Sequence, residues 1–260
     1  MPEPDAPDRV PNETGSIACP VAGPSRNGSI EQLSATIREL EQFAYTISHD
    51  LQAPLRSILG FSQLLSRRHK DQLSGEALEF LGYIEQSAQQ AQAQIQDLLR
   101  LSRVGRGERH VETRSLEDTL RNVLKHLNER VQESSAVIDY DPLPRICTDH
   151  GLLAQLLQQL IDNAIKFHRP GEAPRVKIQV TAENSGWRIS VADNGIGIPA
   201  DQLDNVFIVF RRLHAADKYP GTGMGLTIAR KIALLLGGSL HATSDGNGSE
   251  FILQLPADVK

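Results

Sequence analysis

The chain has 260 residues, of which 40% are hydrophobic and 23% charged, and its formal net charge at pH 7 is -5. This length allows one or two domains of ordinary globular composition. The acidic balance argues against sequence-independent nucleic-acid binding, which needs a basic surface. Two cysteines are too few for a disulfide framework, and no apolar run approaches the roughly 20 residues of a membrane helix. There is no secretion signal either, so we expect a cytoplasmic protein with no membrane span and no nucleic-acid partner.

The first 29 residues hold six of the 14 prolines, separated by glycine, serine and asparagine. Such a segment cannot bury enough apolar surface to fold by itself. We therefore predict a disordered tail over residues 1–29.

Two heptad-like apolar stripes follow between residues 30 and 104. Their narrow spacing is typical of coiled-coil packing, and the short polar segment 68–75 between them predicts an antiparallel helical hairpin. One hairpin cannot enclose two such stripes, so we predict that two copies form a four-helix bundle, which makes the protein a homodimer. A membrane-surface helix is the weaker alternative, because the polar faces are not basic. The stripes are Leu33, Ile37, Leu40, Ala44, Ile47 and Leu51, then Leu81, Ile84, Ala88, Ala91, Ile95 and Leu98.

Helical and strand-like patterns alternate in residues 112–258. They predict an α/β sandwich, with a mixed sheet covered by helices on one face. The expected helices are 116–131, 152–167 and 223–236, and the expected strands are 137–140, 145–148, 176–181, 187–192, 239–243 and 250–255. Gly105 and Gly107 make residues 105–111 a suitable hinge between hairpin and sandwich. The fold class is thus α+β.

One histidine stands out in the first helix of the hairpin. His49 lies two residues from both Ile47 and Leu51, about 200° around the helix from the apolar stripe. Asp50 can accept a hydrogen bond from Nδ1–H, which leaves Nε2 free to act as a nucleophile. Pro54 is expected to disrupt the helix one turn later. Taken alone, His49 could equally be an ordinary exposed histidine.

Two glycine-rich segments favour a phosphate-binding site. The first, Asp193-Asn-Gly195-Ile-Gly197, follows a predicted strand, and the second, Gly221-Thr222-Gly223-Met-Gly225-Leu226, opens a predicted helix. Backbone N–H groups at such a helix start bind phosphate well. A dinucleotide-binding fold is disfavoured, because no strand precedes the second segment and leucine replaces its third glycine. A tight turn is the alternative for either segment alone.

A third set of polar residues lies on the helix predicted over 152–167. Gln159, Asn163 and Lys166 share one face at spacings of four and three. The asparagine offers a neutral oxygen ligand for a hard cation such as Mg²⁺, and the lysine offers a point charge for phosphate. A solvated polar face is the alternative reading of this set by itself.

In chain order these motifs resemble those of two-component sensor histidine kinases. The matching patterns are His-Asp-x-x-x-Pro, Asn-Ala-Ile-Lys-Phe, Asp-x-Gly-x-Gly, Phe-x-x-Phe and Gly-x-Gly-x-Gly, within residues 30–256. The run from Val206 to Gly221 looks most like the phytochrome-type kinases. The resemblance implies that 30–104 is a dimerisation and histidine-phosphotransfer hairpin, 105–111 a hinge linker, and 112–258 an ATP-binding domain.

Site roles also follow from this resemblance. His49 would be the phosphoacceptor and Asp50 its orienting base, while Asn163 would hold Mg²⁺. Residues 199–222 would form a lid over ATP, anchored by Phe207 and Phe210, with Arg211 or Arg212 near the transferring phosphate. Lys166 would contact a phosphate, and Asp193 would accept the adenine amino group. The full set implied to bind the nucleotide is Asn163, Lys166, Asp193, Gly195, Gly197, Gly221, Thr222, Gly223, Gly225 and Leu226.

The implied activity is autophosphorylation on His49 followed by transfer to an aspartate of a response-regulator receiver domain. Ala53 replaces the polar residue of many relatives, which predicts weak phosphatase activity, and Gln159 replaces the commoner asparagine. The alternative is a catalytically silent dimeric scaffold that binds nucleotide or a receiver domain. An ATPase or chaperone of the same ATP-binding superfamily is disfavoured. Such proteins tend to need a carboxylate base near Asn163, and Gln159 is not one. With so short a tail, we expect a separate sensor protein, or a longer protein of which this chain is the transmitter.

Overall fold

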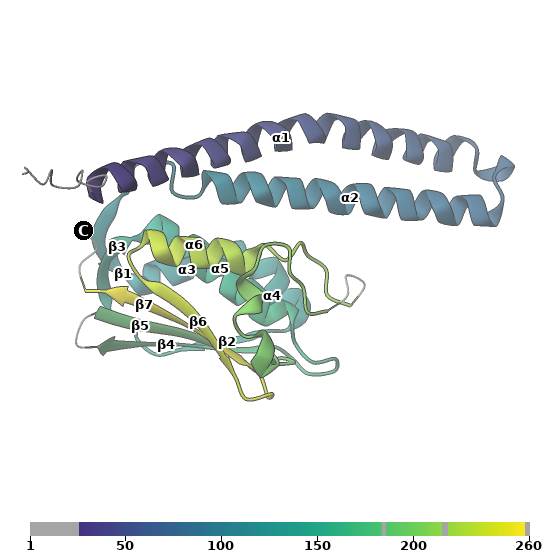
Figure 1. Cartoon of the computed structure of the whole chain (residues 1–260). Coiled ribbons are helices and arrows are strands. Elements are labelled where there is room, and N and C mark those ends of the chain that lie inside the picture. Colours follow the sequence, from purple (N-terminus) through teal and green to yellow (C-terminus); the bar gives the residue numbers. More distant parts are fainter. Residues whose placement is uncertain (1–25, 184–185, 215–217, 258–260) are drawn as a thin grey trace, which may run out of the picture. The chain divides into compact units, whose positions relative to one another are not determined.

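The computed structural model describes residues 26–183, 186–214 and 218–257 (Figure 1). The chain divides into two compact units, Met1–Glu41 and Gln42–Lys260. Most of the predicted tail, residues 1–25, lies outside the described residues. Residues 26–29 differ from the prediction, because the first helix already includes them.

Two long helices form the predicted antiparallel hairpin. They are α1 (Arg26–Arg68) and α2 (Gly75–Arg103), joined by a short 3₁₀ turn at Lys70–Gln72. Ser74 caps α2 by accepting a hydrogen bond from the Ala77 N–H at 3.2 Å. Helix α1 runs through Pro54 without a break, so the expected disruption there is wrong.

Within one chain, the hairpin helices bury small residues and leave large apolar side chains exposed. The buried residues of the two helices, among the described side chains, are Ser48 and Ser62 of α1 and Ala88 and Ser102 of α2. The large apolar side chains that stay exposed, within the part of the hairpin whose side chains the structure describes, are Ile47, Leu51, Ile58, Phe61, Leu64, Leu65, Phe80, Tyr83 and Ile84. We refer to this set as the apolar hairpin face.

The C-terminal part contains a mixed sheet, as predicted, which has five of the six expected strands. The strand order is β2-β4-β5-β7-β6, and only the β2–β4 pair is parallel. A separate antiparallel pair, β1 (Val111–Ser115) with β3 (Arg145–Asp149), was only half expected, because no strand was predicted over 111–115. The strands of the main sheet are β2 (Val137–Tyr140), β4 (Arg175–Glu183), β5 (Gly186–Asp193), β6 (Ser239–Ser244) and β7 (Ser249–Pro256).

Helices cover one face of this sheet, which completes the α/β sandwich (Figure 1). The long helix predicted over 116–131 is in fact two, because the chain leaves helical geometry at Leu127. The core between the layers is aliphatic, with fully buried leucine and isoleucine side chains from α3, α5 and α6. The helices are α3 (Leu116–His126), α4 (Asn128–Ser134), α5 (His150–Lys166) and α6 (Gly225–Leu235), with 3₁₀ turns at Ala200–Gln202 and Asn205–Phe207.

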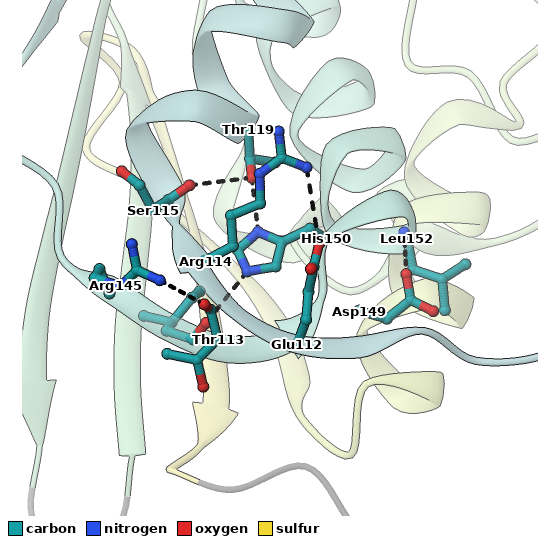
Figure 2. Close-up of polar contacts among 10 residues, drawn as sticks. Glu112, Thr113, Arg114, Ser115, Thr119, Arg145, Asp149, His150 and Leu152 are labelled. Carbon is teal, nitrogen blue, oxygen red and sulfur yellow. Dashed lines mark hydrogen bonds and ion pairs between the residues drawn. The ribbon is translucent and has the colours of Figure 1, made fainter.

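A buried polar cluster holds the start of α5 (Figure 2). Asp149 caps the helix, accepting hydrogen bonds from the N–H groups of Leu152 at 3.0 Å and His110 at 3.2 Å. The buried ring of His150 is hydrogen-bonded at both nitrogens, Nδ1 to Thr119 Oγ1 at 2.7 Å and Nε2 to the Ile146 carbonyl at 3.2 Å. These bonds tie α5 to α3 and β3, and so they fix the helix that carries Gln159, Asn163 and Lys166.

Candidate nucleotide-binding site

The polar face of α5 looks onto the beginning of α6. Gln159, Asn163 and Lys166 are all half-buried, while the opposite face of α5 lies in the core. A Cβ atom on Gly225, the first residue of α6, would lie 2.8 Å from Gln159 Oε1 and 4.0 Å from Asn163 Nδ2. The amide side chains of α5 therefore stand directly beside the N-terminus of α6.

The glycine-rich run leads into α6 without a side-chain cap. Within the part of the chain that the structure describes, no side chain caps the start of this helix, so its first N–H groups are available to an anion. Gly223 has φ of +81°, and a Cβ there would lie 2.7 Å from the Arg211 carbonyl oxygen, so the bend requires glycine. Thr222 donates its hydroxyl hydrogen to the Asp97 carboxylate of α2.

Asp193 ends strand β5 with one carboxylate oxygen engaged. Its Oδ1 accepts hydrogen bonds from the N–H groups of Gly195 at 2.8 Å and Ser249 at 3.2 Å, whereas Oδ2 has no hydrogen-bond donor among the described residues. Burial raises the pKa of Asp193 above its ordinary value, and the two backbone hydrogen bonds oppose that shift. The Oδ2 atom is thus a half-buried acceptor that can receive a donor from a ligand.

A cavity of about 980 Å³ brings most of the predicted nucleotide-binding residues together. Its lining includes Asn163, Lys166, Asp193, Gly197, Gly221, Thr222, Gly223, Gly225 and Leu226. Gly195 is the member that does not line it. A Cβ on Gly195 would lie 2.5 Å from the Phe167 carbonyl oxygen, so this glycine serves the packing of the loop and its hydrogen bond to Asp193. His49 and Asp50 do not line this cavity either.

The Lys166 ammonium lies in the cavity wall in a partly desolvated position. Burial lowers the pKa of Lys166, the Asp162 carboxylate raises it, and the guanidinium groups of Arg212 and Arg130 lower it further. The Nζ atom lies 4.3 Å from the centroid of the Phe167 ring. No described residue forms an ion pair with it within 4.0 Å.

The two arginines that the sequence left undistinguished point in different directions. Arg212 lines the cavity and donates from Nη2 to the Tyr219 carbonyl at 3.0 Å. Arg211 is exposed and also lines the cavity, but its guanidinium donates to Gln202 Oε1 at 3.3 Å. Of these two arginines, only Arg212 lowers the pKa of Lys166, so Arg212 is the better candidate for a phosphate contact.

The segment expected to form a lid is anchored differently from the prediction. Phe207 is buried and packs edge-on against Phe251 at 6.5 Å between ring centroids. Phe210 is 38% exposed with φ of +59°, so its expected role as a second anchor is wrong. Residues 215–217 of this segment lie outside the described part of the chain.

A ring cluster that sequence reasoning missed takes the place of that second anchor. The buried Tyr219 packs at 5.1 Å from the Phe167 ring and 5.5 Å from the His214 ring, measured between centroids. Its hydroxyl donates to the His168 carbonyl at 3.2 Å. The tyrosine stands directly before the Pro-Gly that opens the glycine run, which is the one sequence signal that could have revealed it.

His49 is presented to solvent on α1. Its side chain is 72% exposed, and Nδ1 lies 3.3 Å from Oδ1 of Asp50. In the tautomer with the proton on Nδ1, that carboxylate can accept the proton's hydrogen bond, and Nε2 carries the lone pair. His49 is therefore an exposed histidine with a carboxylate beside its ring.

The described residues hold no group of three or more histidine, cysteine or acidic side chains that could bind a metal ion. Asn163 and Gln159 are neutral amides, which bind Mg²⁺ only as part of a larger set of oxygen ligands. Such a set exists where phosphate oxygens and water complete the shell, as Mg²⁺ prefers. The donor chemistry therefore fits a metal that arrives with a polyphosphate.

Two family comparisons agree with this geometry. The family described as His Kinase A (phospho-acceptor) domain matches residues 39–107, and the family described as Histidine kinase-, DNA gyrase B-, and HSP90-like ATPase matches residues 148–259. The chain belongs to the two-component sensor histidine kinases and comprises a transmitter region, in which an ATP-binding domain follows the phospho-acceptor hairpin.

Individual relatives are phytochromes and sensor kinases. Cyanobacterial phytochrome A of Nostoc sp. is 40% identical over 84% of this chain and 28% of its own length. Phytochrome-like protein Cph1 of Synechocystis sp. is 34% identical over 84% of this chain and 29% of its own length. The crystal structure of full-length ShkA in complex with AMPPNP aligns with a TM-score of 0.60 and 28% identity, covering 84% of this chain and 46% of that one.

The chain thus spans less than a third of the length of these two curated relatives. Among the described residues, no helix combines the length and apolar character needed to cross a membrane.

Proposed function

We propose that the chain is an ATP-dependent protein histidine kinase that autophosphorylates on His49 and passes the phosphoryl group to a response-regulator aspartate. The observation that carries this proposal is the cavity at the start of α6, which gathers Asn163, Lys166 and Asp193 around one uncapped helix end. The match of the hairpin to a phospho-acceptor family supports His49 as the acceptor.

The chemistry of the cavity fits ATP at both ends. Asp193 Oδ2 is a free acceptor suited to the exocyclic amino group of adenine. At the other end, the N–H groups of α6 and the Lys166 ammonium suit the phosphates. Asn163, with Gln159 beside it, would hold Mg²⁺ through its amide oxygen, and the ion would neutralise phosphate charge.

In the proposed reaction, His49 Nε2 attacks the γ-phosphorus in line with the leaving oxygen. A P–N bond forms as the P–O bond to ADP breaks. Asp50 supports this role, because its carboxylate beside Nδ1 holds the reactive tautomer and stabilises the positive charge that the ring acquires. We further propose that residues 105–111 act as the hinge that lets the nucleophile and the nucleotide meet.

The apolar hairpin face supports a homodimer as the working form. Among the described side chains of the hairpin, nine large apolar ones remain exposed in one chain. They extend along both helices, as expected for the partner-facing surface of a four-helix bundle. We propose that a second hairpin covers this face and that the receiver domain binds the dimer.

Incubation with γ-labelled ATP and Mg²⁺ tests the proposal. Wild type should acquire acid-labile, alkali-stable label, which a response-regulator receiver domain then removes. His49→Gln should abolish labelling, whereas His69→Gln should keep it, because His69 is the matched exposed histidine near the hairpin tip. Label that persists in His49→Gln would refute the assignment of the phosphoacceptor. Nucleotide binding without any labelling would favour the silent scaffold.

A further inference from the structure

An ion pair outside the sequence motifs borders the nucleotide cavity. Arg130 of α4 donates from Nη1 to Oδ1 of Asp162 on α5, and both residues line the cavity. Asp162 is the less exposed partner, at 29% of its side chain against 59% for Arg130. The pair joins α4 to α5 through residues 32 positions apart in the sequence.

Asp162 has a second potential partner on its own helix. Lys166 lies four residues further along α5, the spacing at which an aspartate and a lysine can form an ion pair. The two are close enough for the carboxylate to raise the lysine pKa. Nevertheless, Asp162 is bound to Arg130. The Lys166 ammonium instead lies over the Phe167 ring and beside Gly221, where a Cβ atom would be 2.9 Å from Nζ.

We propose that Arg130 is a positioning residue that holds the Asp162 carboxylate away from Lys166, which leaves the Lys166 ammonium available to a nucleotide phosphate. Without the guanidinium, the carboxylate would pair with the ammonium along α5. An arriving phosphate would then have to displace that carboxylate and would face its uncompensated charge in a partly desolvated site. The inference rests on the proposed function, because it takes the ligand of Lys166 to be a phosphate of ATP.

Binding of ATP, ADP and adenosine to Arg130→Ala, measured by titration calorimetry on the full chain, tests this role. One weakened charge-assisted phosphate contact should reduce ATP affinity about tenfold and ADP affinity less, with adenosine unchanged within about twofold. Arg130→Lys should restore most of the ATP affinity, because it keeps the charge next to Asp162. An equal loss for all three ligands would mean that Arg130 only holds α4 against α5, and would overturn the proposal.

A double-mutant cycle distinguishes a positioning role of Arg130 from a general electrostatic effect of its charge on ATP affinity. Asp162→Asn alone should change ATP affinity less than about twofold, yet it should restore that affinity in the Arg130→Ala background, a clearly non-additive result. If Asp162→Asn strengthens ATP binding by the same factor in both backgrounds, simple charge addition explains the data and the proposal fails.

The wild-type titrations distinguish a failure of the proposed Arg130 role from a failure of the proposed ATP site. If wild type binds ATP more tightly than adenosine but Arg130→Ala binds both as wild type does, only the role of Arg130 is refuted. If wild type does not prefer ATP to adenosine, both that role and the proposed ATP site are refuted.

Discussion

Replacing Asp193 with asparagine should weaken nucleotide binding while leaving the fold intact. The variant keeps an oxygen that can accept the N–H groups of Gly195 and Ser249, so the loop retains its two hydrogen bonds. It loses the anionic Oδ2, the atom proposed to accept the adenine amino group. A hydrogen bond to a charged group contributes about 1.5–3 kcal/mol, which corresponds to a loss of roughly 10- to 150-fold in ATP affinity.

The same substitution should raise the stability of the folded protein at neutral pH or leave it unchanged. Burial raises the pKa of Asp193, so the folded state binds a proton more readily than the unfolded state does. The contribution of this group to stability therefore falls as pH rises from its ordinary pKa through the raised one. At neutral pH wild type carries the full cost of the buried charge, which asparagine does not have.

Fluorescence titration with a labelled ATP analogue and thermal unfolding, both run from pH 4.5 to 8, would measure these effects. Wild type should lose ATP affinity as pH falls through the raised pKa of Asp193, whereas Asp193→Asn should bind weakly without that dependence. Asp245→Asn is the matched control, because Asp245 also accepts a backbone N–H, at 2.8 Å from Asn247, but does not line the cavity. Wild-type affinity in Asp193→Asn, or a lower melting temperature at pH 7, would refute the reasoning.

Three further predictions concern Arg211 and Arg212, the apolar hairpin face, and dephosphorylation of the receiver domain. Arg212→Ala should reduce the autophosphorylation rate about tenfold or more, and Arg211→Ala less than about threefold, in initial-rate assays; equal effects would contradict the assignment. Phe61→Glu should shift the protein to monomer in light scattering at micromolar concentration, whereas Phe61→Met should remain dimeric, because only glutamate places a charge in the apolar hairpin face. Ala53→Thr should increase dephosphorylation of a phosphorylated receiver domain, and no gain would count against the predicted phosphatase defect.

Local sequence periodicity was enough to predict the helices and most strands. The spacing that puts Gln159, Asn163 and Lys166 on one face of α5 follows from helix geometry alone. Strand β1 escaped prediction because Val-Glu-Thr-Arg-Ser shows neither alternation nor a buried apolar run, and its three leading residues are exposed. It exists because β3 offers it a partner, which is a tertiary condition.

The direction of a side chain was the least predictable feature. Neighbouring residues Arg211 and Arg212 are chemically identical and both line the cavity, and only the fold of segment 199–222 directs one to Gln202 and the other to the Tyr219 carbonyl. Phe210 was expected to anchor the segment together with Phe207, because the family resemblance implied it. Its left-handed backbone instead leaves it exposed, and the anchor is Tyr219.

By itself, then, the sequence determined most of the helices and strands, the two glycine-rich segments and the residue types that could carry the chemistry, because those properties depend on short-range spacing. Tertiary structure decided which of these residues meet. The uncapped start of α6 beside the amides of α5 and the Arg130–Asp162 pair both join residues distant in sequence. Contacts of that kind arise from burial and electrostatics between elements, which no local pattern encodes.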